Sequence, residues 1–146
     1  MNRRIIFLSI LFAVISFSLN AQPKNKPKSI ISTNSTFKRY YDKTELESLQ
    51  KGELIGLYTE RIRLLVSTLP YIAMASKAGV TMSDIGIPDN AENRKALDVE
   101  QETSAVFLTS TVDFQTKMLP YCDKPTIITC ILFYESMLKE LHTMNE

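Results

Sequence analysis

Apolar residues recur every three to five positions through most of the chain, which is the spacing of amphipathic helices. Thr44 and Glu47 have the spacing of a capping box, so the first long helix is predicted to start at Thr44. Pro70 would end it, and Gly52 favours a break near Lys51. The apolar stripe of this helix, over about 45–69, consists of Leu46, Leu49, Leu54, Leu57, Tyr58, Ile62, Leu65 and Leu69.

A second long helix is predicted to begin after Asp89 or Asn90, either of which can cap it, and to end at Pro120. One stripe of this helix consists of Leu97, Gln101, Ala105, Leu108, Val112, Gln115 and Leu119. A third helix over 124–142 is capped by Asp123 and carries Pro125 in its first turn. Its apolar positions cover much of its circumference, so we expect it to be the central helix.

The connections between these helices are predicted to be short. "YIAMASKAG" after Pro70 should form about two more helical turns and stop at Gly79, and Thr81 and Asp84 predict one further turn that ends near Gly86. No segment shows a strand-turn-strand pattern. The sequence therefore predicts an all-α fold, a small helical bundle of three long helices plus short helices, preceded by a flexible basic N-terminal arm.

The tripeptide Leu-Pro-Tyr occurs twice, at 69–71 and at 119–121, and each copy closes a long helix. The repeat fits a duplicated helical hairpin, or two helix ends that use the same residues by chance. If the halves are a duplication, Tyr71 and Tyr121 should occupy equivalent places. As residues just beyond helix ends, the two tyrosines are candidates for an interface or for anchoring a loop on the core.

The N-terminus predicts export. Arg3 and Arg4 precede an apolar run over 5–19, which is shorter than the roughly 20 residues that span a bilayer. We expect a signal peptide over 1–21, cleaved after Ala21, with an uncleaved membrane anchor as the alternative. A polar arm over 22–43 and a helical domain over 44–146 follow. The mature protein is then expected in the periplasm or at the cell surface.

Charge is distributed unevenly between these parts. The arm over 22–43 carries six Lys or Arg residues and one acidic residue, a net charge of +5, whereas 44–146 has a net charge of −6. Either the arm is solvated or lies on its own acidic body, or it contacts anionic lipid or another acidic surface. Nucleic acid is not an expected partner, because export removes that target and the body has no basic face.

Two cysteines, Cys122 and Cys130, are the only thiols. Export allows a disulfide between them if the loop folds back along the last helix, and the alternative is two reduced side chains that behave as small apolar groups.

Residue types that carry chemistry are scarce. His142 is the single histidine, and no motif for zinc, di-iron, phosphate or dinucleotide binding occurs. Asp98 and Glu102 share a helix face and are expected to be solvated. The sequence therefore predicts no enzyme activity, no metal site and no cofactor.

Several polar residues instead suggest structural or binding roles. Gln101 and Gln115 lie in the stripe of the second long helix, and Arg61 lies near that of the first, so all three are candidate buried polar residues that need hydrogen-bond partners. Asp84 and Asp89 in "MSDIGIPDN" are candidates for an interaction or for anchoring their loop.

These patterns favour a small exported helical protein that acts by binding another envelope protein, as an accessory or structural subunit of a complex. An inhibitor or immunity-type protein that blocks an enzyme is the first alternative. An enzyme or a small-ligand binding bundle, with a pocket between helices lined by Tyr134, Gln101 and Arg61, is the second.

Overall fold

The computed structural model describes residues 27–32, 39–75 and 77–144; the predicted signal peptide and its cleavage after Ala21 lie outside these ranges. The described part is all-α, which confirms the predicted fold class. Its α-helices are α2 (Lys43–Ser48), α3 (Lys51–Thr68), α4 (Ala91–Met118) and α5 (Lys124–Thr143). Three short 3-10 helices accompany them: η2 (Leu69–Tyr71), η3 (Ser83–Ile85) and η4 (Leu119–Tyr121).

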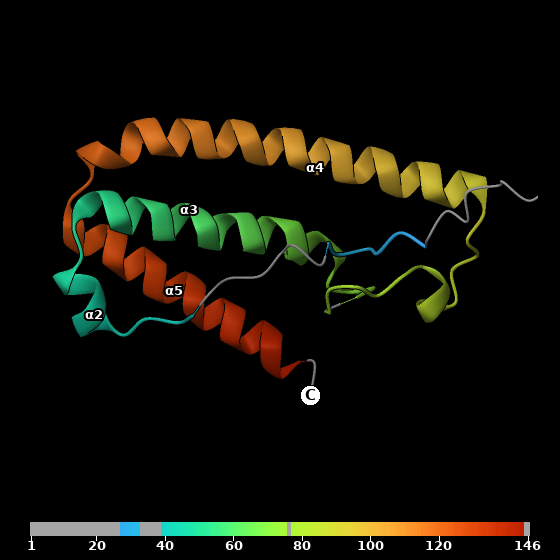
Figure 1. The fold of residues 1–146 in the computed structure, drawn as a ribbon, viewed down its shortest axis with the longest axis horizontal. Coiled ribbons are helices and arrows are strands. Elements are labelled where there is room, and N and C mark those ends of the chain that lie inside the picture. Colours follow the sequence, from blue (N-terminus) through green and yellow to red (C-terminus); the bar gives the residue numbers. More distant parts are fainter. Residues whose placement is uncertain (1–26, 33–38, 76, 145–146) are drawn as a thin grey trace, which may run out of the picture.

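Helix α3 is the central element of the bundle. It packs against α5 on one side and against α4 on the other, while α4 and α5 do not pack along each other (Figure 1). Helix α4 runs antiparallel to α3 and forms one edge of the molecule. The expectation that the last helix is central was therefore wrong. The broad apolar surface of α5 is covered by α2, by α3 and by Tyr41 instead.

The break in the first long helix falls at Leu49–Gln50, slightly before the predicted position. The predicted capping box at Thr44 was also wrong. Asp42 caps α2 in a capping box with Glu45, and Gln50 forms a second box with Glu53 at the start of α3. A carboxylate at position 42 accepts from the Glu45 amide at 2.8 Å and so starts the helix before Thr44.

The caps of the other two long helices agree with the sequence. Asn90 accepts a hydrogen bond from the Asn93 amide at the start of α4. Asp123 accepts from the Thr126 amide at the start of α5, and Pro125 lies in its first turn, where an amide would have no helical partner.

Most of the buried apolar residues form two separate clusters. The first lies between α2, α3 and α5; its buried members are Leu46, Leu54, Tyr58, Ile127, Ile128 and Ile131. The second lies at the other end of α3; its buried members are Ile30, Ile31, Tyr71, Ala75 and Met82. Burial of each large aliphatic side chain contributes roughly 1.5–3 kcal/mol. Part of the predicted flexible arm is thus packed, since residues 27–32 supply two isoleucines to the second cluster.

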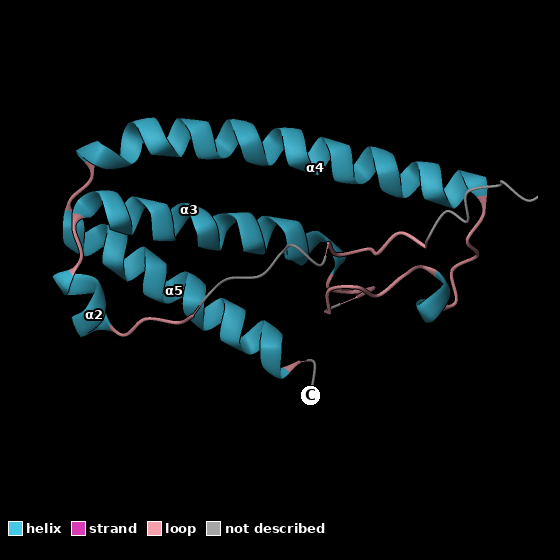
Figure 2. Cartoon of the chain, in the orientation of Figure 1, coloured by secondary structure: helices cyan, strands magenta, loops and turns pink. Residues whose placement is uncertain are grey.

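Irregular chain is concentrated between η2 and α4 (Figure 2). The predicted helical turns after Pro70 do not form; residues 72–74 make a turn instead. The backbone there pairs with the arm, because the Ile30 amide donates to the Val80 carbonyl at 2.8 Å and the Gly79 amide donates to the Ile31 carbonyl at 3.1 Å. The predicted turn near Asp84 is η3, which ends at Gly86 with a φ of +79°.

Across the described ranges, the helices are all too short or too polar to cross a bilayer.

Candidate interaction face

The two Leu-Pro-Tyr copies have the same local fold and different surroundings. Each forms a 3-10 turn at the end of a long helix. Tyr71 is buried, with 4% of its surface exposed, whereas Tyr121 is 87% exposed. The tyrosines are therefore not equivalent, and the structure favours a shared way of ending a helix over a duplicated hairpin.

The predicted stripe of α4 faces α3. Val112 is its one buried residue, and Leu97, Leu108 and Leu119 are half-buried. This arrangement follows from the antiparallel packing of α4 on α3, which covers one side of the helix only.

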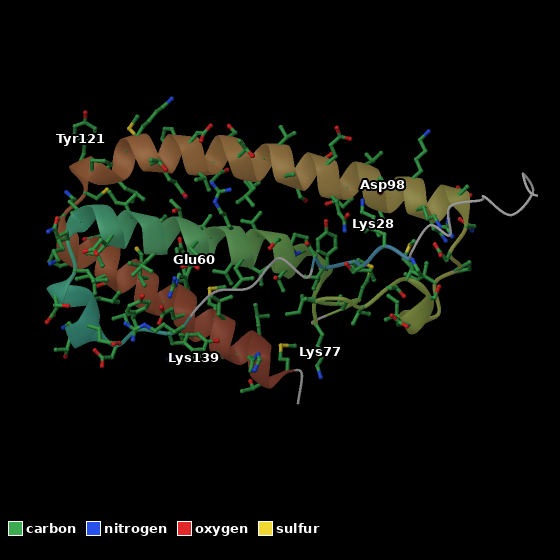
Figure 3. The ribbon with its side chains drawn as sticks, viewed as in Figure 1. Lys28, Glu60, Lys77, Asp98, Tyr121 and Lys139 are labelled. Atoms are coloured by element: carbon green, nitrogen blue, oxygen red, sulfur yellow. The ribbon has the colours of Figure 1, made fainter. Side chains whose placement is uncertain are left out.

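The opposite side of α4 is exposed and rich in apolar groups. We call it the outward face of α4; its apolar members are Val99, Val106, Phe107, Phe114, Met118 and, on η4, Tyr121. The two phenylalanines are 58% and 63% exposed. Tyr121 points away from α3 (Figure 3). Apolar groups gathered on one exposed face are typical of an interaction surface.

Sequence reasoning identified Tyr121 in this face and missed the two phenylalanines. The signal was present, because Phe107, Phe114 and Tyr121 lie seven residues apart and opposite the predicted stripe. A shallow depression on the same helix, between Val106 and Phe114, adds polar groups from Ser110, Asp113 and Lys117.

Arg61 lies at the centre of a buried polar cluster, which confirms the prediction that it is a buried polar residue. Its Nη2 and Nε atoms donate to Glu135 Oε1 at 2.7 and 3.1 Å, and its Nη1 donates to Glu60. Both Arg61 and Glu135 are almost fully buried. Glu135 was not identified from the sequence, although it lies between Ile131 and Leu138 on the apolar stripe of α5.

This cluster attaches the chain before α2 to the bundle. The Tyr41 amide donates to Glu135 Oε2 at 2.9 Å, and Arg61 Nη2 donates to the Arg39 carbonyl at 2.8 Å. The Arg39 guanidinium lies over the Tyr41 ring, 4.1 Å from its centroid. Burial, followed by the nearby Glu135 charge, raises the pKa of Tyr40. The charges of Arg61 and Glu135 are enclosed by protein, so their ion pair is suited to a structural role.

Gln101 connects the arm to α4. Its Nε2 donates to the carbonyls of Ser29 and Ile30 at 3.0 and 2.9 Å, and Lys28 pairs with Asp98 one turn away (Figure 3). These contacts agree with the expectation that the basic arm lies on its own acidic body, for residues 27–32. Gln115 differs, because its buried Oε1 atom has no hydrogen-bond partner in the part of the chain that the structure describes.

Asp84 and Asp89 are engaged within their own loop. Asp84 Oδ2 accepts from the Thr81 amide and hydroxyl at 2.8 and 2.7 Å, which lowers its pKa. Asp89 receives two hydrogen bonds from Arg94, at 2.6 and 2.8 Å, which lowers its pKa too. Of the two roles predicted for these residues, the contacts fit loop anchoring.

Both cysteines are free in the structure. Cys122 is exposed in the loop after η4, and Cys130 is half-buried against the first apolar cluster. In the part of the chain that the structure describes, no group of three or more His, Cys, Asp or Glu residues could hold a metal ion.

The predicted ligand pocket is not formed by its three residues. Arg61 is enclosed by its ion pair, and the pocket that Gln101 lines contains neither Arg61 nor Tyr134. That pocket, of about 190 Å³, lies between Val66, Tyr71 and Leu108. Among the described residues, the buried Tyr71 hydroxyl has no hydrogen-bond partner.

Comparisons with protein-family models, with curated proteins and with solved structures find no match to this chain.

Proposed function

We propose that this chain is an exported helical protein that binds another envelope protein, as an accessory or structural subunit of a complex. Its docking surface is the outward face of α4. The observation that carries the proposal is the exposure of Phe107, Phe114 and Tyr121 on the side of α4 turned away from α3.

Aromatic side chains are well suited to such a surface. They bury large apolar area with few rotatable bonds, and tyrosine adds a hydroxyl that stays hydrogen-bonded at a wet rim. Lys117 lies exposed between Phe114 and Tyr121 along the chain, and Glu100 lies exposed two turns before Phe107, so both charges can help to select a partner. The face runs along a helix of 28 residues, so an elongated partner such as another helix fits it.

The test is affinity purification of the tagged protein from its native envelope, followed by mass spectrometry. The double variant Phe107→Ser/Phe114→Ser removes two apolar anchors from an exposed surface, and so should leave the fold intact. The matched control is Phe133→Ser, because Phe133 is 60% exposed but lies on α5. We expect the wild type and the control to capture the same partner and the double variant to lose it.

Two results would contradict the proposal. Recovery of no specific partner by the wild type would argue against a subunit role. Equal capture by the double variant and the wild type would show that binding does not use the outward face of α4.

A further inference from the structure

The outward face of α4 has the residue spacing of a coiled-coil seam. Steps of four and three residues alternate along a set that we call the outward row: Ala96, Glu100, Thr103, Phe107, Ser110, Phe114, Lys117 and Tyr121. Every member of the row is exposed. This alternation keeps the row on one side of α4 from Ala96 to Lys117, and Tyr121 lies on the 3-10 turn that follows, so a second helix can pack along the row.

Side-chain size alternates along the row. The three aromatic residues occupy one set of seam positions, and Ala96, Thr103 and Ser110 occupy the other. The Thr103 hydroxyl donates to the Val99 carbonyl at 2.8 Å, so that its polar group is already satisfied within the helix. Phe107 therefore lies between two small residues of the row, Thr103 and Ser110, and Phe114 lies between Ser110 and Lys117.

The outward rows of two copies of α4 are complementary to each other when the two helices run in opposite directions. If two copies of α4 pair antiparallel with Phe107 opposite Ser110, then Phe114 meets Thr103 and Tyr121 meets Ala96. The one remaining layer places Lys117 opposite Glu100. Every layer then combines a large side chain with a small one, or a positive charge with a negative one.

A parallel pair would have none of these advantages. Each residue would face its own copy, so the aromatic layers would be overfilled and the small layers would leave gaps. Lys117 would face Lys117, and Glu100 would face Glu100, at a cost from like charges.

We infer that the subunit received by the outward face of α4 is a second copy of this chain, in an antiparallel, two-fold symmetric dimer. This inference rests on the proposed docking face. In this dimer a two-fold axis passes near residues 108–109, so every contact occurs twice. Two-fold symmetry is the usual symmetry of a homodimer. Val99, Val106 and Met118 flank the outward row and enlarge the apolar area that pairing would cover.

The test uses the purified mature chain and charge exchange across the proposed pair. Sedimentation equilibrium should show a dimer for the wild type. Glu100→Lys or Lys117→Glu alone creates two like-charge contacts per dimer and should raise the dissociation constant about tenfold. Glu100→Lys with Lys117→Glu restores opposite charges and should return the constant to within about twofold of the wild type.

Circular dichroism of each variant checks that the monomer fold is retained, because both residues are exposed. A wild type that stays monomeric at the highest concentration that sedimentation can reach overturns the inference. So does a double variant as weak as the two single variants, because its charges would then not face each other.

Cross-linking tests the orientation. In a Cys122→Ser/Cys130→Ala background, which has no native thiol, Glu100→Cys with Lys117→Cys should give a disulfide-linked dimer under mild oxidation. Either cysteine alone should not, because the two copies of residue 100 are about 26 Å apart along an antiparallel pair. Cross-linking of the single-cysteine variants would show parallel pairing and would overturn the inference.

Failure of this inference can be distinguished from failure of the proposed function. A monomeric wild type whose envelope partner is lost in Phe107→Ser/Phe114→Ser overturns only the second-copy inference. A dimer whose envelope partner is unaffected by that variant supports the inference and overturns docking of the other protein at this face. A monomer with unaffected capture overturns both.

Discussion

Arg61 on α3 and Glu135 on α5 form an ion pair inside the protein, with Nη2 and Oε1 2.7 Å apart and each side chain only 1% exposed. The pair also holds the backbone of Arg39 and Tyr41, so it joins three segments that are distant in the sequence. A buried pair of this kind stabilises the fold less through its own attraction than through the cost of leaving either charge alone.

Loss of one partner should therefore be costly. Arg61→Met leaves Glu135 with the Tyr41 amide as its remaining described donor, and should lower the free energy of unfolding by about 3–5 kcal/mol. Arg61→Met with Glu135→Leu should recover most of that loss, because no buried charge remains unpaired. Urea unfolding followed by circular dichroism measures both values. Arg63→Met is the control, since Arg63 is exposed on the same helix.

The two buried tyrosine hydroxyls should respond oppositely to removal. The Tyr71 hydroxyl has no hydrogen-bond partner among the described residues, so Tyr71→Phe should leave the free energy of unfolding unchanged or raise it by about 1 kcal/mol. The Tyr58 hydroxyl lies 3.2 Å from the Tyr134 hydroxyl, so Tyr58→Phe should lower the free energy of unfolding by about 1 kcal/mol. Thermal and urea unfolding compare them. Equal losses in both variants would show that the Tyr71 hydroxyl is satisfied in solution.

Gln101 should control the attachment of residues 27–32. Gln101→Leu removes the donor to the carbonyls of Ser29 and Ile30, so the arm should open more often. Hydrogen exchange at the Ile30 and Gly79 amides, which bond to partners across this contact, should accelerate about tenfold. Glu102→Leu, an exposed change beside it, is the control. Unchanged exchange in Gln101→Leu would mean that the buried isoleucines hold the arm alone.

The cap of α5 should make a pH-dependent contribution to stability. Hydrogen bonds from the Thr126 hydroxyl and amide lower the pKa of Asp123 below its usual 3.8. The carboxylate thus favours folding above that value, and its contribution disappears as the pH falls through the lower pKa of the folded state. Asp123→Asn keeps an oxygen acceptor without the charge, and should reduce the acid dependence of the melting temperature. Asp113→Asn, in the middle of α4, should not.

The thiols should differ in reactivity. Cys122 is exposed and Cys130 half-buried, so the native protein should react quickly with one equivalent of a thiol reagent and slowly with a second. The protein isolated from its native source and unfolded without reductant should give two thiols. A count of zero would instead show a disulfide between Cys122 and Cys130.

Helix ends were the most predictable part of the fold. Asn90, Asp123, Pro120 and Gly86 act locally, through side chains or backbone angles that need no distant partner. The capping box at Thr44 was mistaken for the same reason, since Asp42 offers an equally local and stronger competing cap.

Contacts between distant segments could not be read in this way. The sequence indicated that Arg61 needs a partner, but Glu135 is 74 residues away, and its position in an apolar stripe has meaning only once α3 and α5 are packed. Likewise, the broad apolar surface of α5 did not make α5 the central helix, because α2, α3 and Tyr41 cover that surface.

By itself, the sequence determined that the chain is helical, where the long helices end, and that Gln101 and Arg61 need partners, because periodicity and capping act within a few residues. Only the tertiary structure decided that α3 is central, that residues 27–32 complete a core, and that one of two identical tripeptides is buried while the other is exposed. Burial is a property of neighbours brought together by packing. The same packing leaves the aromatic residues of α4 on the outside.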